Sequence, residues 1–382
     1  MISEKKRAIL KKIDCLQKKG KPIPKCLLCQ LAQCDKPEKN CSPIIAPPST
    51  PNTSTIVGPY LKLITEVLYP KGGSALFPDF SLNIQYYNQG DYYSTYDHLF
   101  SDLSGGPYGM TQASSVNAIQ QYFTSVYGTV PDVVKNSVVV GKPLVPAAAS
   151  NSYVDLGTLN NWFLQANSNN IPSGGYMFWS AGFLNDGYPS SIIPNKTFKD
   201  LQSKHKVMYI GAGTTGQVYL ADGSQAVYAQ ASDPDGSNAL KVLKSYVEAG
   251  WNELLLAFWN KTANSDWIID WASINKDSQK KVINQLRAIN PNVKVLVSAG
   301  GAYGLVGPQA GDPVDWATQL TNFAVENNLD GIDLDLEAGL LGTQWTTEQY
   351  NWVKTVVETI ASINNKLMLS FAPVGPLCAV PN

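Results

Sequence analysis

The chain has 382 residues, of which 44% are hydrophobic and 15% charged, so it can form one large domain or two ordinary ones and is too apolar for general disorder. Its longest apolar runs fall far short of the roughly 18 residues that indicate a membrane span, and no transmembrane helix is expected. The net charge of −1 is unevenly divided, because residues 1–40 carry 11 Lys+Arg and 4 Asp+Glu. A basic tail of charge +7 therefore precedes an acidic body of charge −8.

The first 59 residues differ in composition from the rest of the chain. Residues 1–43 form a basic tail without a visible secretory signal, and residues 44–59 are rich in Pro, Ser and Thr, which predicts an extended linker. The tail holds five of the six cysteines, which could form disulfides or bind zinc: Cys15, Cys26, Cys29, Cys34 and Cys41. The localisation of the protein is left open by this composition. One interpretation of the cysteine-rich tail is that the protein lies in an oxidising environment or is packaged in a particle. Basic charge without interleaved aromatic residues does not favour a nucleic-acid partner.

From about residue 60 onward, eight β-rich runs alternate with loops or with segments of helical periodicity. Apolar residues recur at helical spacing in 314–328 and 348–365, for example. The alternation predicts an α/β fold in residues 60–382, a (β/α)8 barrel. The predicted strands are 81–87, 137–145, 174–179, 206–211, 253–259, 293–301, 329–337 and 366–373.

The strand 329–337 carries the clearest chemical signal. Side chains alternate between the faces of a strand, so Asp333, Asp335 and Glu337 share one face while aliphatic residues share the other. Neighbouring carboxylates in a partly desolvated pocket oppose full ionisation, so at least one should stay protonated near neutral pH. A protonated Glu beside ionised Asp suits general-acid cleavage of a glycosidic bond. The alternatives are a solvated acidic edge or a cation site. The two histidines, His98 and His205, exclude a zinc site that needs three, and no metal or cofactor is expected.

The motif DGIDLDLE (330–337) resembles the D-x-x-D-x-D-x-E signature of glycoside hydrolase family 18, the chitinases and their relatives. SAGG (298–301) is similar to the S-x-G-G motif on that family's third strand. Five further segments resemble the family's second, fifth, sixth, seventh and eighth strands, in that order: LAFW (256–259), LSFAP (369–373), IQYYN (84–88), KPLVPAA (142–148) and GGYMFWS (174–180). The plant-type, single-barrel branch is the most similar.

The resemblance implies a substrate-assisted, retaining mechanism in which the substrate's own acetamido oxygen attacks the anomeric carbon. It implies Glu337 as the acid, Asp335 as the group that orients the acetamido group, Asp333 as the support of Asp335, and Tyr87 as a hydrogen-bond donor to the acetamido carbonyl. Trp179 would form the floor of a sugar subsite. The remaining candidate binding residues are Gln85, Asn88, Met177, Ser298, Gly300 and Gly301. Strand alternation agrees, since Gln85 and Tyr87 share a face, as do Met177 and Trp179, and Ser298 and Gly300.

The order of these motifs differs from that of the family. Sequences that resemble strands six to eight lie in residues 60–200, and those that resemble strands one to five lie in 201–382. This predicts a circularly permuted barrel, with the fused ends of two incomplete barrels as the alternative. Permutation would bring the chain's ends near the active-site rim, where a Cys41–Cys378 disulfide could close the barrel.

The sequence therefore predicts a hydrolase of β-1,4-linked N-acetylglucosamine polymers, chitin or chitooligosaccharides. The rival hypothesis is a non-hydrolytic sugar-binding protein, or a structural protein of a larger assembly that is joined through the tail.

Overall fold

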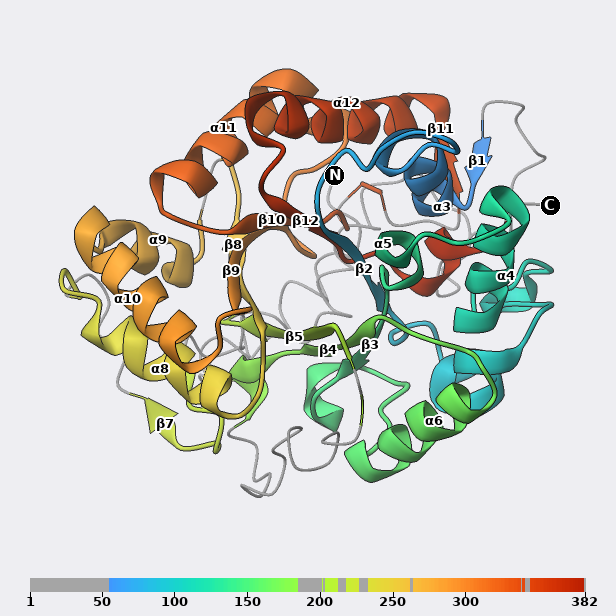
Figure 1. Ribbon diagram of the computed structural model, residues 1–382, viewed down its shortest axis with the longest axis horizontal. Helices are drawn as coiled ribbons and strands as arrows, with labels where there is room; N and C mark the ends of the chain where they lie inside the picture. The colour runs from blue at the N-terminus through green and yellow to red at the C-terminus, as the bar shows by residue number, and fades with distance from the viewer. Residues whose placement is uncertain are drawn as a thin grey trace, which may run out of the picture. The chain divides into compact units, whose positions relative to one another are not determined.

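Eight parallel strands close into a barrel that is ringed by helices (Figure 1). The computed structural model describes residues 55–184, 201, 203–211, 218–226, 233–261, 264–337, 339–340 and 344–380. The barrel strands are β2 (Phe80–Gln85), β3 (Val138–Pro143), β4 (Gly175–Trp179), β5 (His205–Ile210), β8 (Glu253–Trp259), β9 (Lys294–Gly300), β10 (Gly331–Asp335) and β12 (Met368–Phe371). The prediction of an α/β barrel is confirmed, and each predicted strand is present with its ends shifted by at most two residues.

The barrel closes between its first and last strands along the chain. β12 pairs with β2 in parallel, with Leu369 opposite Phe80 and Ser370 opposite Ser81. Every other barrel strand pairs with its neighbours in chain order. The described chain therefore forms one complete barrel without an open edge, and its early and late segments meet at a single seam.

Helices cover the outside of the barrel. They are α3 (Pro59–Leu63), α4 (Val116–Tyr127), α5 (Asp132–Lys135), α6 (Leu156–Ser168), α8 (Ser237–Glu248), α9 (Asp266–Ser273), α10 (Lys276–Ile289), α11 (Pro313–Glu326) and α12 (Thr347–Asn364). The helices predicted at 314–328 and 348–365 are α11 and α12. Thr346 and Gln349 form a capping box at the start of α12, and Asp312 caps α11 just before Pro313.

Short elements lie in the segments around the barrel strands and helices. Four are short strands: β1 (Thr55–Val57), β6 (Val218–Tyr219), β7 (Gln225–Ala226) and β11 (Gln344–Thr346). The others are short 3-10 or π helices, labelled η: η1 (Ile64–Leu68), η2 (Tyr92–Ser94), η3 (Asp97–Ser101), η4 (Pro107–Gly109), η5 (Pro146–Ala148), η6 (Ala181–Phe183), η7 (Pro308–Ala310) and η8 (Gly375–Cys378). β1 lies in the segment expected to be a linker, and there it pairs antiparallel with β11. The linker was predicted to reach residue 59, but Pro59 already begins α3; residues 44–54 and the whole basic tail lie outside the described residues.

The hydrophobic core has two parts. A large outer cluster fills the space between strands and helices, and a smaller cluster fills the barrel interior with residues such as Val139, Met177 and Leu255. Strand alternation produces this division, because each strand sends one set of side chains inward and the other outward. Among the described helices, none combines the length and the apolarity needed to cross a bilayer.

The seam between β12 and β2 is supported by Phe371, which is fully buried with its ring 5.6 Å from that of Tyr60. Phe371→Ala should lower the free energy of unfolding by about 3–5 kcal/mol, since it leaves a cavity in the outer core. Ile363→Ala, at a position that is 42% exposed, is the control and should cost less than about 1 kcal/mol. Chemical denaturation followed by circular dichroism measures both, and equal losses would contradict this account of the seam.

Candidate functional site

The candidate site is a group of polar side chains inside the barrel and at the carboxyl ends of its strands. Asp333 and Asp335 on β10 are buried and share the inward face, as strand alternation predicted. Residues opposite them on the neighbouring strands also point inward. Ser298 and Ser370 flank Asp333, and Gly300 lies opposite Asp335.

Asp333 is held by three hydroxyl groups. Ser298 Oγ and Tyr209 Oη donate to its Oδ2 at 2.6 and 2.8 Å, and Ser370 Oγ donates to its Oδ1 at 2.6 Å. Burial raises the pKa of Asp333, the three hydroxyl donors oppose that rise, and the charge of Glu253 adds to it. Burial therefore opposes ionisation of Asp333, while the three hydroxyl donors favour it.

Gln85 joins the two other acidic residues. Its Nε2 lies 3.1 Å from Asp335 Oδ1, 3.2 Å from Glu337 Oε1 and 2.7 Å from the carbonyl oxygen of Ala372. The amide therefore fixes Asp335 and Glu337 on the same side of the barrel mouth. Gln85 on β2 thus meets the last residue of β10, Asp335, across 250 positions of sequence.

Glu337 lies beyond the strand that was predicted to contain it. β10 ends at Asp335, and the backbone N–H of Glu337 turns back to donate to the carbonyl oxygen of Asp335 at 3.1 Å. The predicted alternation therefore holds for the two aspartates only. Glu337 reaches the same side through this turn, and it is partly exposed while both aspartates are buried.

Two aromatic residues line the same end of the barrel. Tyr87 is buried in the interior cluster, and burial together with the charges of Asp335, Glu337 and Asp333 raises its pKa, so the phenol keeps its proton. Trp179, at the end of β4, is partly exposed. Its ring stacks on Phe258 at 5.7 Å with an interplanar angle of 24°, and it packs edge-on against Tyr209 at 5.3 Å. The peptide bonds Trp179–Ser180 and Ala257–Phe258 are cis.

The paired glycines of the SAGG motif are required by close packing. Gly300 has φ of +106°, and a Cβ there would lie 2.2 Å from the carbonyl oxygen of Asp335. At Gly301, with φ of +75°, a Cβ would lie 2.8 Å from the ring of Phe258. Neither position accepts a side chain without movement of its neighbours. The glycines thus let β9 approach the acidic strand and the aromatic stack.

Two other predicted binding residues lie in different surroundings. Met177 is fully buried inside the barrel, where it packs in the interior cluster. Asn88 is exposed, and its Oδ1 accepts hydrogen bonds from Ser150 N at 2.9 Å and Ser150 Oγ at 3.0 Å. Contact of either residue with a ligand stays a prediction.

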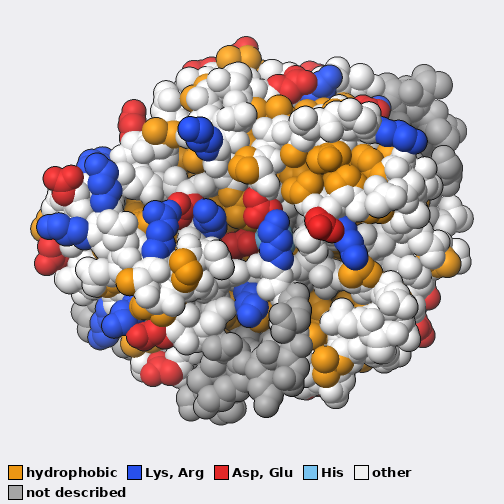
Figure 2. All heavy atoms as spheres, in the orientation of Figure 1, with side chains coloured by type: hydrophobic (Ala, Val, Ile, Leu, Met, Phe, Trp, Pro, Cys, Tyr) orange, Lys and Arg blue, Asp and Glu red, His pale blue; other side chains and the backbone are white. Residues whose placement is uncertain are grey.

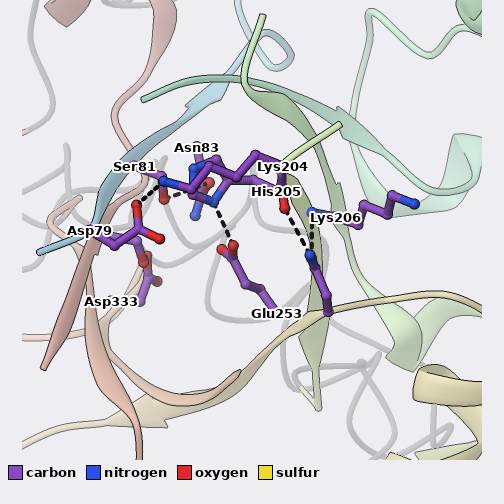
Figure 3. A network of polar contacts seen from close by, with 10 residues as sticks. Asp79, Ser81, Asn83, Lys204, His205, Lys206, Glu253 and Asp333 are labelled. Atoms are coloured by element: carbon purple, nitrogen blue, oxygen red, sulfur yellow. Dashed lines mark hydrogen bonds and ion pairs between the residues drawn. The ribbon is translucent and has the colours of Figure 1, made fainter. Parts of the chain in front are cut away.

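A second polar group occupies the opposite end of the barrel (Figure 3). His205 and Glu253, at the starts of β5 and β8, are buried and joined by a 2.5 Å contact between Nδ1 and Oε1. In the described chain, His205 Nε2 and Glu253 Oε2 have no hydrogen-bond partner. Nearby, Lys204 pairs with Asp79 at 2.5 Å. This pair was not predicted, although in the sequence His205 directly precedes one predicted strand and Glu253 begins the next.

Cys378 in η8 is buried, and burial raises the pKa of its thiol. Cys41 lies outside the described residues, so the predicted Cys41–Cys378 bridge stays a prediction, as does zinc in the tail. The described residues contain no group of three or more His, Cys, Asp or Glu that could hold a metal ion. On the face in Figure 2, basic and acidic side chains are interspersed, and hydrophobic side chains gather in one area toward the upper right of the view.

Comparisons with known proteins assign no family. No protein-family model and no curated protein matches the chain. Among solved structures, it is similar to one titled "QR15, an Aldolase", at 12% identity over 64% of this chain and 93% of that chain, with a TM-score of 0.31. A likeness at this level carries no argument about function. The barrel is established by its own strand pairing, a fold that often supports enzymes.

The raised pKa of Asp333 predicts a specific pH dependence of stability. The folded state binds the proton of the Asp333 carboxyl more tightly than the unfolded state does. The stability that this proton contributes is therefore fully present below the unfolded pKa of about 3.9 and is lost as the pH rises through the folded pKa. Asp333→Asn cannot ionise. The free energy of unfolding of the wild type should therefore fall relative to that of Asp333→Asn as the pH rises from about 4. Urea denaturation across this range measures the difference, and parallel pH profiles would refute the shift.

Proposed function

We propose that the protein hydrolyses β-1,4-linked N-acetylglucosamine polymers, chitin or chitooligosaccharides, by a substrate-assisted retaining mechanism. The observation that carries this proposal is the contact of one amide, Gln85 Nε2, with both Asp335 and Glu337 at the mouth of a closed barrel. The resemblance of the DGIDLDLE motif to the family signature supports the same proposal. Barrel enzymes keep their active sites at this end.

Each acidic residue suits a different role. Glu337 is partly exposed at the barrel mouth, where it can protonate the leaving oxygen of a bound glycoside. Asp335 is buried below it, where its carboxylate would orient the acetamido group and stabilise the positive charge that develops on it. Asp333, fully buried with its three hydroxyl donors, would support Asp335 from inside the barrel.

The aromatic residues would hold the sugar. Tyr87 keeps its phenolic proton because its pKa is raised, so it can donate a hydrogen bond to the acetamido carbonyl. Trp179 presents a partly exposed ring that rests on Phe258 and Tyr209, and such a supported aromatic surface suits stacking against a pyranose ring.

We also propose that the barrel is a circular permutation of the family arrangement. The strands that resemble the family's fifth and sixth, β12 and β2, pair with each other, as do those that resemble the eighth and first, β4 and β5. Near the seam, η8 at the end of the described chain packs against α3 near its beginning. A single closed barrel supports permutation over the fusion of two incomplete barrels.

Glu337→Gln should lower turnover of a fluorogenic chitooligosaccharide by about 10²-fold or more and leave folding and oligosaccharide affinity close to wild type, because it removes only the proton donor. Glu326→Gln, at an exposed position on α11, is the matched control and should keep wild-type turnover. Near-normal turnover in Glu337→Gln would exclude Glu337 as the acid. If the wild type binds the sugar without hydrolysing it, the sugar-binding alternative holds instead.

The acetamido group of the substrate should be essential for the reaction. With acetylated and deacetylated chitooligosaccharides of equal length, only the acetylated substrate should be cleaved efficiently, since the other lacks the internal nucleophile. Product analysis by chromatography measures both rates. Efficient cleavage of glucosamine oligomers would argue against substrate assistance while leaving the hydrolase assignment open.

A further inference from the structure

Lys142 is a fully buried lysine next to the candidate site. It lies on β3 between Gly141 and Pro143, and Gly141 faces the barrel interior, where a Cβ would lie 2.6 Å from Met177 Cε. By alternation, the side chain of Lys142 points outward, into the layer under the loops at the barrel mouth. An ammonium group buried in this way must be fully hydrogen-bonded, since it has lost its hydration.

Three backbone carbonyl groups surround the ammonium. Lys142 Nζ donates to the carbonyl oxygens of Tyr93 at 2.7 Å, Tyr86 at 2.9 Å and Ser152 at 3.0 Å. These use all three of its donors. In the part of the chain that the structure describes, no carboxylate forms an ion pair with Lys142. The three carbonyl oxygens stabilise the ammonium, while burial opposes the charged form and lowers the pKa of Lys142 to about 7.

The three carbonyl groups come from two loops that leave the barrel at the same end as the acidic residues. Tyr86 and Tyr93 belong to the segment after β2, and Ser152 belongs to the segment after β3, the adjacent strand in the barrel (Figure 1). Further bonds join the two segments, with Ser152 Oγ donating to the carbonyl oxygen of Gly90 at 2.5 Å and Ser150 donating to Asn88. Asn88 and Ser152 have φ of +64° and +61°, a conformation that is uncommon for a residue such as serine.

Tyr86 links this arrangement to the site. Its N–H donates to the carbonyl oxygen of Gly141 at 3.1 Å, and its own carbonyl oxygen accepts from Lys142. Both polar groups of its backbone are thus fixed by β3. The next residue is Tyr87, whose side chain lies inside the barrel. The peptide that sets the direction of Tyr87 is therefore held by the ammonium group.

We propose that Lys142 is a positioning residue of the site: its ammonium, enclosed by the carbonyls of Tyr86, Tyr93 and Ser152, holds the two loops together and fixes Tyr87. This rests on the proposed glycoside hydrolysis for its effect on turnover. The carbonyl groups form an oxygen cage of the kind that binds a cation, and the lysine supplies that cation from within the chain. Misplacement of a reacting group by about 1 Å can cost about 10²-fold in rate.

The first test is a double-mutant cycle with Tyr87→Phe and Lys142→Met on a soluble chitooligosaccharide. If Lys142 acts through Tyr87, Lys142→Met lowers kcat about 10-fold or more and changes KM less than about threefold. The double variant then has a kcat only slightly lower than that of Tyr87→Phe alone. Lys366→Met, at an exposed lysine, is the control. Effects that multiply, or a loss of thermal stability with kcat and KM unchanged, would overturn the positioning role.

The second test is chemical rescue. Lys142→Ala lacks the atoms of a propylammonium ion, so this ion in the buffer should restore kcat toward that of the wild type, while 1-propanol and tetramethylammonium, which cannot supply three N–H donors, should not. Rescue by 1-propanol would show that only volume matters and would refute the cage. If Lys142→Ala does not fold without propylammonium, Ser150→Ala, which removes the hydrogen bond from Ser150 Oγ to Asn88 Oδ1, tests the junction between the same loops from an exposed position, and unchanged kcat and KM in that variant would count against the proposal.

A third measurement separates this proposal from the proposed function. If the wild type neither binds nor cleaves chitooligosaccharides, the glycosidase proposal fails, and amide hydrogen exchange still reports on Lys142. Faster exchange in Lys142→Ala confined to residues 86–94 and 144–155, and reversed by propylammonium, supports the cage. Exchange that is unchanged, or faster throughout the barrel, would overturn it.

Discussion

The carboxyl group of Asp333 lies at the centre of the barrel with no exposed surface, and the neighbouring strands are arranged to compensate for its burial. A carboxyl group removed from water is costly unless its oxygens are hydrogen-bonded. Here hydroxyl groups on β5, β9 and β12 replace the water, so three strands each place a polar residue where a barrel ordinarily places an aliphatic one. Asp335 and Glu337 then lie nearer the mouth, where Gln85 contacts both. The site is thus a column of polar groups whose lower end is hydrogen-bonded within the barrel.

Much of this architecture can be predicted from periodicity. The eight runs of β-rich sequence correspond to the eight barrel strands, and alternation along 329–337 correctly predicts that Asp333 and Asp335 lie on the inner face. The inward position of Ser298 follows for the same reason, although alternation does not indicate its specific role as a donor to Asp333. Alternation applies only while the backbone stays extended, so it fails at Glu337, where the chain turns immediately after β10.

The features that escape prediction depend on contacts between distant strands. Tyr209 and Ser370 look like ordinary strand residues until the barrel register sets them beside Asp333. In the sequence, Lys142 is a charged residue inside an apolar run, which indicates that its ammonium has a buried partner. The sequence does not identify that partner, because the ammonium contacts three backbone carbonyl groups and none of the side chains of those residues takes part. No pattern of residue types encodes such a contact.

The seam between β2 and β12 has a consequence for how the protein is made. Gln85 meets partners that follow it by 250 and 287 residues, so at about 5–20 residues per second the ribosome delivers them roughly 10–60 s after Gln85 itself. During that interval β2, β3 and β4 exist without the strand that completes their sheet, and an open sheet edge is a site for pairing with other chains. The acidic strand and its amide partner can come together only after β10 has been made, long after β2. The candidate site therefore forms well after β2, β3 and β4 are made, and a chain interrupted before β12 would carry the acidic residues but not the closed barrel that orients them.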